Sequence, residues 1–238
     1  MKLQSIRTVH QFFATAPVSC PYLSGGAERK LVVELGGPGC AALFADLSRA
    51  GFRRSHGFAY RPACRGCRKC VPVRIAVDRF EPTRSLRRVA RRNDDIRYAL
   101  GPAKATREQY ALFRTYQRRR HGTSDMADMT FGDYRDMVED TPVETWLVEA
   151  RDAEGVLVGG LLVDRTADAL SAAYSFFDAA QARRSLGTQA VLWLVAQARQ
   201  MRLPYVYLGY WVDGSATMDY KRRFPAVEAL VDGRWQPL

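Results

Sequence analysis

The order of the strands and helices predicted for the second half of the chain is the feature that most constrains its fold. Three strand-like runs follow one another, at Glu144–Ala150, Val156–Val163 and Leu170–Phe177. A helix is then predicted over Leu186–Met201 from its apolar periodicity, and a further strand at Tyr205–Trp211. Consecutive strands followed by a strand–helix–strand unit predict an α+β fold with a mixed sheet.

The first half of the chain is predicted to form a separate, smaller unit that ends near the Gly101-Pro102 break. It contains an apolar, alternating strand at Val71–Val77. The second unit opens with a helix near 107–120, because Thr106 and Gln109 have the spacing of a capping box. We therefore expect an N-terminal domain over 1–104 and a C-terminal domain over 105–238.

The two halves also differ in charge. The chain has 36 lysine and arginine residues against 25 acidic ones, a net charge of +11. Residues 1–104 carry 20 basic and 7 acidic side chains, a net charge of +13, whereas the remainder is slightly acidic. Such an asymmetry predicts a polyanionic partner for the first half of the chain.

Three of the five cysteines form a C-x2-C-x2-C cluster at Cys64, Cys67 and Cys70. This spacing lets successive thiolates converge on one ion, and the neighbouring basic side chains offset the charge of a thiolate site. Cys20, which precedes a proline, is the expected fourth ligand, whereas Cys40 lies in an apolar stretch and is expected in the core. A structural zinc ion and an iron–sulfur cluster both fit four thiols, and free thiols in a basic loop are the alternative.

Five arginines recur at helical spacing in a stretch without acidic residues. They lie at positions i, i+3, i+4, i+7 and i+8, and so share one face of a helix: Arg84, Arg87, Arg88, Arg91 and Arg92. A solvated helix face usually mixes both signs of charge, whereas five neighbouring guanidinium groups repel one another. We therefore predict that this face contacts nucleic-acid phosphates, with an inert basic surface as the alternative.

Longer motifs run in order along the whole chain. Those of the first half are Cys20-Pro-Tyr-Leu23, Tyr60-Arg-Pro, Val71-Pro-Val-Arg-Ile75 after the cysteine cluster, and Thr83-Arg-Ser-Leu-Arg-Arg88. Those of the second half are Tyr174-Ser-Phe-Phe-Asp178, Arg183-Arg-Ser-Leu-Gly-Thr188, Leu208-Gly-Tyr-Trp211 and Met218-Asp-Tyr-Lys221. Together they resemble the aminoacyl-tRNA–protein transferases, and most closely the short bacterial aspartate/glutamate leucyltransferases. The second half is accordingly expected to be a GNAT-type acyltransferase domain.

The resemblance implies transfer of leucine from leucyl-tRNA to proteins that begin with aspartate or glutamate, which marks them for degradation in the N-degron pathway. It implies a cytoplasmic enzyme that needs no cofactor for the chemistry itself. Members of the family usually carry a cysteine shortly after the Gly-Tyr-Trp segment, where this chain has Ser215. We therefore expect direct aminolysis of the aminoacyl ester, without a cysteinyl intermediate.

The resemblance also implies where the reaction takes place. GNAT-type domains splay two strands apart to admit the acyl donor, and here these are the strands at Leu170–Phe177 and Tyr205–Trp211. Tyr174 or Asp178 is expected to assist proton removal, and Lys221 to hold the acceptor carboxylate or the oxyanion. The candidates for binding the acidic acceptor are Arg61, Arg74 and Tyr220. Arg184 and Gly187, at the start of the following helix, are expected to bind a tRNA phosphate.

Two other classes of function compete with this one. A coenzyme A-dependent N-acetyltransferase would fit the C-terminal fold pattern but would leave the charge of the first half and the cysteines unexplained. A non-catalytic, metal-stapled RNA-binding protein would fit the first half alone. No apolar run approaches the roughly 18 residues of a membrane span, so no membrane partner is expected.

Overall fold

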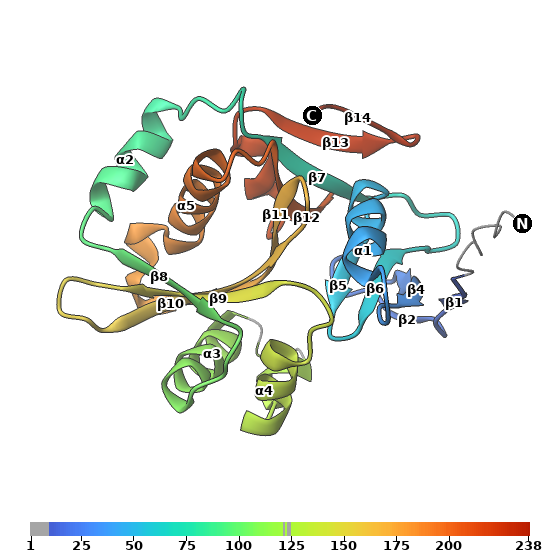
Figure 1. Cartoon of the computed structure of the whole chain (residues 1–238), viewed down its shortest axis with the longest axis horizontal. Helices are drawn as coiled ribbons and strands as arrows, with labels where there is room; N and C mark the ends of the chain where they lie inside the picture. Colours follow the sequence, from blue (N-terminus) through green and yellow to red (C-terminus); the bar gives the residue numbers. More distant parts are fainter. Residues whose placement is uncertain (1–9, 121, 123–124) are drawn as a thin grey trace, which may run out of the picture.

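The computed structural model describes residues 10–120, 122 and 125–238. Within these ranges the chain forms an eight-stranded sheet, a four-stranded sheet, a two-stranded ribbon and five α-helices (Figure 1). The α-helices are α1 (Cys40–Arg49), α2 (Arg84–Arg92), α3 (Arg107–Arg120), α4 (Phe131–Glu139) and α5 (Leu186–Gln200). Short 3-10 helices are η1 (Asp125–Asp128), η2 (Ala179–Arg184) and η3 (Asp219–Arg223). None of the helices in the described ranges is long and apolar enough to cross a bilayer.

The eight-stranded sheet forms the centre of the molecule. Its strands, in spatial order, are β14 (Arg234–Pro237), β13 (Val227–Val231), β7 (Cys70–Ala76), β12 (Tyr205–Val212), β11 (Ala169–Phe177), β10 (Leu157–Arg165), β9 (Thr145–Arg151) and β8 (Arg97–Pro102). Strands β11 and β12 run parallel, and the other neighbouring pairs are antiparallel. The predicted α+β fold with a mixed sheet is therefore confirmed.

The boundary expected near residue 104 does not separate the two sheets. Strand β7 lies between β12 and β13, and β8 forms one edge of the same sheet. Val73 and Ile75 of β7 are buried in the core that the sheet shares with α5. The alternation of apolar residues predicted this strand correctly, but its hydrogen-bonding partners lie far along the chain, in what was expected to be the other domain.

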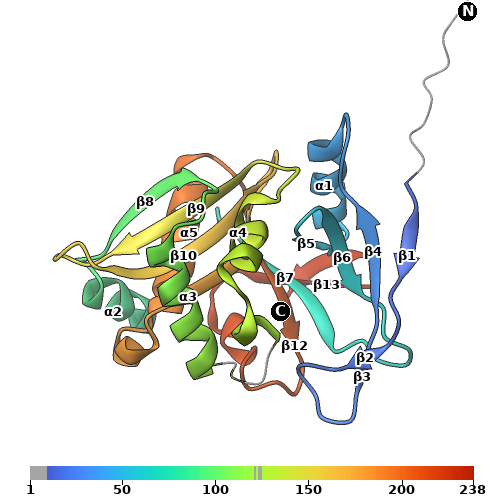
Figure 2. The ribbon, with the colours of Figure 1, turned by 90° about the horizontal axis from the view of Figure 1, so that it is seen from below.

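The four-stranded sheet stands to one side of the larger sheet (Figure 2). Its strands are β1 (Phe12–Ala14), β4 (Lys30–Glu34), β6 (Phe58–Pro62) and β5 (Arg53–Ser55), and β2 (Val18–Ser19) pairs with β3 (Ala27–Glu28) in the ribbon. Phe44 and Leu47 of α1 pack with Val33 and Ala59 in a separate small core. Cys40 is buried in this core, as its apolar neighbours predicted.

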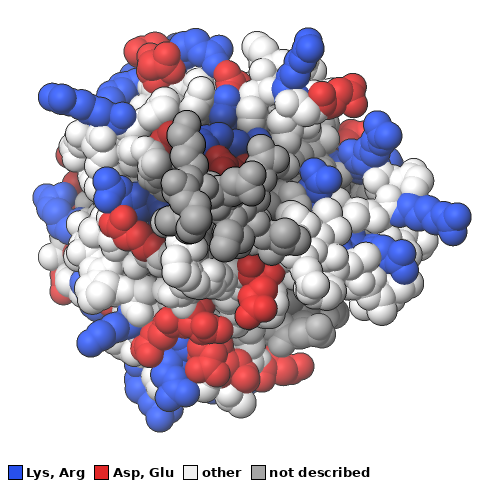
Figure 3. All heavy atoms as spheres, turned by 45° about the vertical axis from the view of Figure 1, so that its right-hand side comes forward, with Lys and Arg blue, Asp and Glu red and all other residues white. Residues whose placement is uncertain are grey.

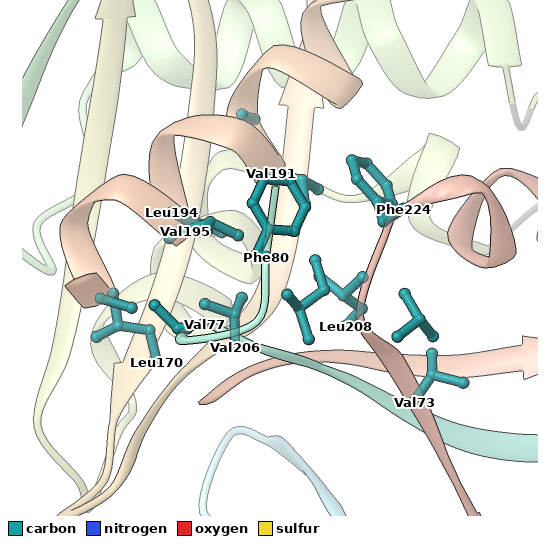
Figure 4. Packing of buried hydrophobic residues seen from close by; sticks show 14 of the residues in the cluster. Val73, Val77, Phe80, Leu170, Val191, Leu194, Val195, Val206, Leu208 and Phe224 are labelled. Atoms are coloured by element: carbon teal, nitrogen blue, oxygen red, sulfur yellow. The ribbon is translucent and has the colours of Figure 1, made fainter. Parts of the chain in front are cut away.

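The main core lies between the large sheet and α5. Leu194 and Val195 of α5 pack against Leu170 of β11 and Val206 of β12 (Figure 4). The apolar side of α5 recurs every four residues, which is the pattern of a helix that packs on a sheet: Leu186, Ala190, Leu194 and Ala198 are all buried. The predicted helix and its two flanking strands therefore lie where the sequence placed them.

Helices α3 and α4 cover the opposite face of the sheet (Figure 1). The ring of Phe113 lies 5.0 Å from that of Tyr134 and 5.7 Å from that of Phe176, centre to centre. The capping box expected before α3 is present: the Thr106 N–H donates to Gln109 Oε1 at 2.8 Å, and the Gln109 N–H donates to Thr106 Oγ1 at 3.2 Å. Helix α4 was not predicted from the sequence.

A buried ion pair joins the two sheets. Arg54 of β5 contacts Asp164 of β10 with 2.7 Å between Nη2 and Oδ1, and their side chains are 1% and 0% exposed. The Thr145 hydroxyl donates to the same carboxylate oxygen at 2.8 Å. Because a buried carboxylate is stabilised only when its hydrogen bonds are satisfied, this contact fixes where β5 meets the larger sheet.

Candidate functional site

The parallel pair β11 and β12 opens into a split. The two strands are in register at residues 169–171 and 205–207, and the pairing ends at Ser171 and Tyr207. Beyond that point β11 continues alongside β10, while β12 continues alongside β7 through an irregularity between Tyr207 and Gly209. The splayed strands expected of an acyl-donor site are therefore present in the predicted pair.

The side chain of Arg53, from β5, fills the apex of this split. Its Nη2 donates to the carbonyl oxygens of Ala172 at 2.5 Å and Ala173 at 2.7 Å, both on β11. Its Nη1 donates to the carbonyl of Leu208 on β12 at 3.3 Å. One guanidinium group therefore bridges the two strands where they part.

Lys221 of η3 lies next to the split with its side chain buried. It is 6% exposed, and its Nζ donates to the carbonyl of Tyr210 on β12 at 2.6 Å. Burial, and secondarily the positive charge of Arg53, lower the pKa of Lys221 to about 7, against an opposing effect of Cys70. A substantial fraction of this amine is therefore uncharged at neutral pH. The ring centre of Tyr220 lies 5.9 Å from the same Nζ.

Tyr174 lies on β11 beyond the divergence and faces α3. Its hydroxyl oxygen accepts a hydrogen bond from Gln117 Nε2 at 2.6 Å, and burial raises its pKa well above the ordinary value. The phenol therefore stays protonated at neutral pH, which argues against the expected role as a base. Its own hydrogen is available for donation instead.

Asp178 and the start of α5 are occupied by local structure. The Asp178 carboxylate accepts from the Ala180 N–H at 2.9 Å and from Gln181 Nε2 at 3.1 Å, and so caps η2. Arg184 donates to Asn93 at 2.9 Å and pairs with Asp95. A Cβ on Gly187 would lie 2.9 Å from the Phe177 ring, so this glycine serves close packing. These contacts do not bring Asp178, Arg184 or Gly187 to Lys221.

The expected acceptor cations Arg61 and Arg74 lie elsewhere. Arg74 is buried on β7, where its Nε donates to Glu228 Oε2 at 2.7 Å and its guanidinium lies 3.5 Å from the ring centre of Tyr205. Its charge is therefore neutralised within the fold, in an ion pair that local sequence cannot reveal. Arg61 is exposed on β6, with its guanidinium 5.1 Å from the ring centre of Phe52.

The five arginines predicted to share one helix face do so on α2, and they are called the arginine stripe from here on. Thr83 caps this helix by accepting from the Leu86 N–H at 3.3 Å, and Leu86 is the residue that anchors it in the core. The five stripe residues are exposed, and in the described ranges no carboxylate forms an ion pair with them: Arg84, Arg87, Arg88, Arg91 and Arg92. Arg87 and Arg92 donate to backbone carbonyls, which leaves the charge of the stripe unbalanced.

Negative charge collects on another part of the surface. Figure 3 shows acidic side chains gathered at the lower edge of the face that includes the smaller sheet. A pocket near α4 is lined mainly by aspartates, together with His56 and Met129: Asp128, Asp133, Asp136 and Asp140. Because these carboxylates repel phosphate, α2 is the better candidate for a nucleic-acid surface.

The four candidate cysteine ligands lie in one neighbourhood. Cys64 and Cys67 are in the loop between β6 and β7, Cys70 begins β7, and Cys20 follows β2. Burial, followed by the effects of Cys64, Cys20 and Cys67, raises the pKa of Cys70 to about 12. No group of three or more side chains in the described ranges has the arrangement of a metal site. The thiols are neighbours without forming a ready ligand set.

Sequence profiles of two parts of one protein family match most of the chain. The profile for arginine-tRNA-protein transferase, N terminus, matches residues 18–88, and the profile for the C terminus matches residues 108–231. The chain belongs to the arginine-tRNA–protein transferase family. Both strands of the split and the cysteine loop lie within the matched ranges, and so does α2 as far as Arg88.

Relatives named aspartate/glutamate leucyltransferase share about half of their residues with this family member. The protein of Paramagnetospirillum magneticum is 52% identical over 231 residues, which cover 97% of this chain and 95% of that protein. That of Gluconacetobacter diazotrophicus is 50% identical over 238 residues, 100% of this chain and 92% of the relative. Among solved structures, L-PGS from Bacillus licheniformis has a TM-score of 0.50 at 10% identity, over 88% of this chain and 73% of that chain. This last likeness concerns the fold alone.

Sequence motifs led to Tyr174, Tyr220 and Lys221 but not to Arg53. The partners of Arg53 are backbone carbonyls, so no pattern of side chains in the sequence indicates these contacts. One signal was present in the Leu208-Gly-Tyr-Trp211 motif. A Cβ at Gly209 would stand 1.4 Å from Arg53 Nη1, and the φ of Gly209 is +76°. A glycine within a predicted strand indicates close approach of another group.

Proposed function

We propose that this protein transfers leucine from leucyl-tRNA to the amino terminus of acceptor proteins that begin with aspartate or glutamate. The observation that carries the proposal is the identity of about half of all residues with relatives of that name, over nearly the full length of both chains. The new N-terminal leucine would mark the acceptor for degradation in the cytoplasm, through the N-degron pathway.

The chemistry is direct aminolysis of an activated ester. The acceptor α-amine bonds to the carbonyl carbon of the leucyl ester, and the bond from that carbon to the ribose oxygen breaks. The amine loses one proton and the ribose oxygen gains one. Lys221 suits proton acceptance because a pKa of about 7 leaves much of the amine uncharged. Tyr174 suits proton donation, because its oxygen already accepts from Gln117. These roles reverse those expected from the sequence.

The split favours this reaction over acetyl transfer from coenzyme A. The apex, where an acetyltransferase admits its thioester donor between the strands, holds the guanidinium of Arg53.

The test of the proposed function uses tRNA charged with labelled leucine and peptides that differ only in an N-terminal aspartate or asparagine. Label should pass to the aspartyl peptide alone. Transfer of arginine from arginyl-tRNA, with no transfer of leucine, would contradict leucyl-tRNA as the donor. Acetylation of the peptide by acetyl-coenzyme A would contradict the proposal as a whole.

The stripe on α2 supports contact with the tRNA backbone. Arg88 and Arg91 are suitable for substitution because they are exposed and, among the described residues, neither side chain forms a hydrogen bond within the protein. Replacing both by alanine should weaken the binding of charged and uncharged tRNA alike. The slope of log affinity against log salt should become shallower by about 0.7–0.9 for each lost phosphate contact.

Filter binding at several salt concentrations measures this effect. Arg135 and Arg234 provide a matched control, since both are exposed and neither is on α2. Their double replacement by alanine removes the same net charge but should leave the slope close to that of the wild type. If the two double variants behave alike, the stripe acts only through net charge and makes no direct contact.

We also propose that Cys20, Cys64, Cys67 and Cys70 hold a structural metal centre, zinc or iron–sulfur. Support comes from their shared neighbourhood, in which three of the thiols act on the pKa of the fourth. Metal would supply folding energy there, and no step of the transfer passes through it. Anaerobically purified protein should contain about one equivalent of zinc or of cluster, and chelation should lower its melting temperature. Less than about 0.2 equivalents of zinc and iron combined would contradict this proposal.

A further inference from the structure

Two consecutive arginines of β5 connect the smaller sheet to the larger one. Arg54 forms the buried ion pair with Asp164 of β10. Arg53 instead enters the split between β11 and β12. The same short strand therefore fastens the two sheets together and delivers a cation to the candidate transfer site.

Arg53 donates to backbone carbonyls just beyond the point where the pairing of β11 with β12 ends. Its three hydrogen bonds go to carbonyls on both sides of the apex, at Ala172, Ala173 and Leu208. A buried carbonyl without a hydrogen bond destabilises the fold, so these bonds stabilise the open arrangement of the two strands. Gly209 makes the room, because any side chain there would overlap the guanidinium.

Among the described residues Arg53 forms no ion pair with a carboxylate, and its side-chain hydrogen bonds go to backbone carbonyls of the split. Lys221 contacts the same strand β12, where its Nζ donates to the carbonyl of Tyr210 at 2.6 Å. The guanidinium of Arg53 and the amine of Lys221 are therefore both bound to the backbone of β12, close to the point where it leaves β11.

We propose that Arg53 is a positioning residue of the transfer site: it holds β11 and β12 in their divergent arrangement at the apex of the split. The proposal rests on the proposed function and deepens it. Arg53 acts through the strand backbone, without touching the reacting atoms. Its loss should therefore lower kcat while leaving the KM for leucyl-tRNA nearly unchanged, because the tRNA contact proposed above lies on α2 and not at the split.

The first experiment compares Arg53→Ala with Arg135→Ala, an exposed arginine on α4, in the full-length protein. Without the guanidinium, β11 and β12 should shift at the apex of the split, which should lower the kcat of Arg53→Ala about 10²-fold. Arg135→Ala should match the wild type. Guanidinium ion, added far below denaturing concentrations, should restore part of the lost kcat, and methylammonium should not. A folded Arg53→Ala protein with wild-type kcat overturns the proposal, and so does a loss confined to the KM for leucyl-tRNA.

Two further variants keep the test decisive if Arg53→Ala does not fold. Gly209→Ala retains Arg53 but places a Cβ where Nη1 lies, so the guanidinium must leave the apex. Its kcat should fall and added guanidinium should not restore it, because the apex stays blocked. Arg53→Lys keeps the charge but loses the planar fork that bridges both strands. Wild-type kcat in a folded Arg53→Lys protein overturns the proposal that the guanidinium of Arg53 positions the two strands.

Leucine transfer by the wild type separates this proposal from the proposed function. A wild-type protein that transfers no leucine overturns the proposed function. A wild type that transfers leucine, together with a folded Arg53→Ala protein of equal kcat, overturns only the proposed role of Arg53.

Discussion

Replacement of Lys221 by methionine is expected to lower the transfer rate about 10²-fold and, at the same time, to stabilise the folded protein at neutral pH. The rate should fall because the variant lacks the amine that we propose takes the proton of the attacking acceptor. Stability rises because the fold no longer has to bury a lysine that has no carboxylate partner among the described residues. Methionine has a similar length and flexibility, so the side chain still fills its space.

The direction of the stability change with pH follows from the lowered pKa. Lys221 has a pKa of about 7 in the folded protein and an ordinary value of 10.5. Between these values the unfolded chain binds more protons, so the stability of the wild type rises with pH. Each pKa unit corresponds to about 1.4 kcal/mol, and the lost hydrogen bond to Tyr210 offsets about 1 kcal/mol. The methionine variant should therefore gain on the order of 4 kcal/mol below pH 7, and the gain should vanish toward pH 10.5.

Urea unfolding at about pH 6.5 and about pH 9.5 measures this difference, and leucine transfer measures the rate. Lys104, exposed between β8 and α3, supplies the control: Lys104→Met should change neither quantity. The wild-type rate at saturating substrates should itself fall below about pH 7, because protonated Lys221 cannot accept a proton. An Lys221→Met protein that is destabilised equally at both pH values would contradict the assignment of an uncharged amine.

Local sequence predicted α3, α5 and the strands β9 to β12 because each has a strong signal of its own. Helix α5 has apolar residues every four positions, and α3 has its capping box. The sheet as a whole was not predictable in the same way. Strands β7 and β8 pair with partners far along the chain, and no local signal encodes which strands will meet. The predicted domain boundary therefore lies at the Gly101-Pro102 break in the sequence and not between the large and the small sheet.

The candidate site was predictable where its residues lie in recognisable motifs. Lys221, Tyr174 and Tyr220 lie near the split that the fold class predicted. The chemical roles that we propose for them could not be derived from local sequence, since these depend on burial and on partners. Arg74 illustrates the limit, because it lies within a motif yet is neutralised by Glu228, a partner 154 residues away. Arg53 illustrates the reverse: it has no motif of its own, and three-dimensional contacts alone bring it to the split.

The ion pair between Arg54 and Asp164 should be the most sensitive contact for stability. Asp164→Ala is expected to destabilise the protein by about 3–5 kcal/mol, because it leaves the guanidinium of Arg54 buried without an anion. It also removes the acceptor of the Thr145 hydroxyl bond. The pair of Arg49 with Asp46 is a control of the same chemistry at the surface, with side chains 44% and 76% exposed. Asp46→Ala should therefore cost less than about 1 kcal/mol.

A second variant separates the charge from the position. Replacing Arg54 by methionine together with Asp164 by leucine removes both buried charges, so most of the stability lost in Asp164→Ala should return. Transfer should not recover to the same extent, because the charged contact also sets where β5 delivers Arg53. Denaturant midpoints and transfer rates of the single and double variants test both statements. A double variant no more stable than Asp164→Ala would show that the buried charge is not the cause, and full recovery of transfer would show that hydrophobic contact alone holds β5 in place.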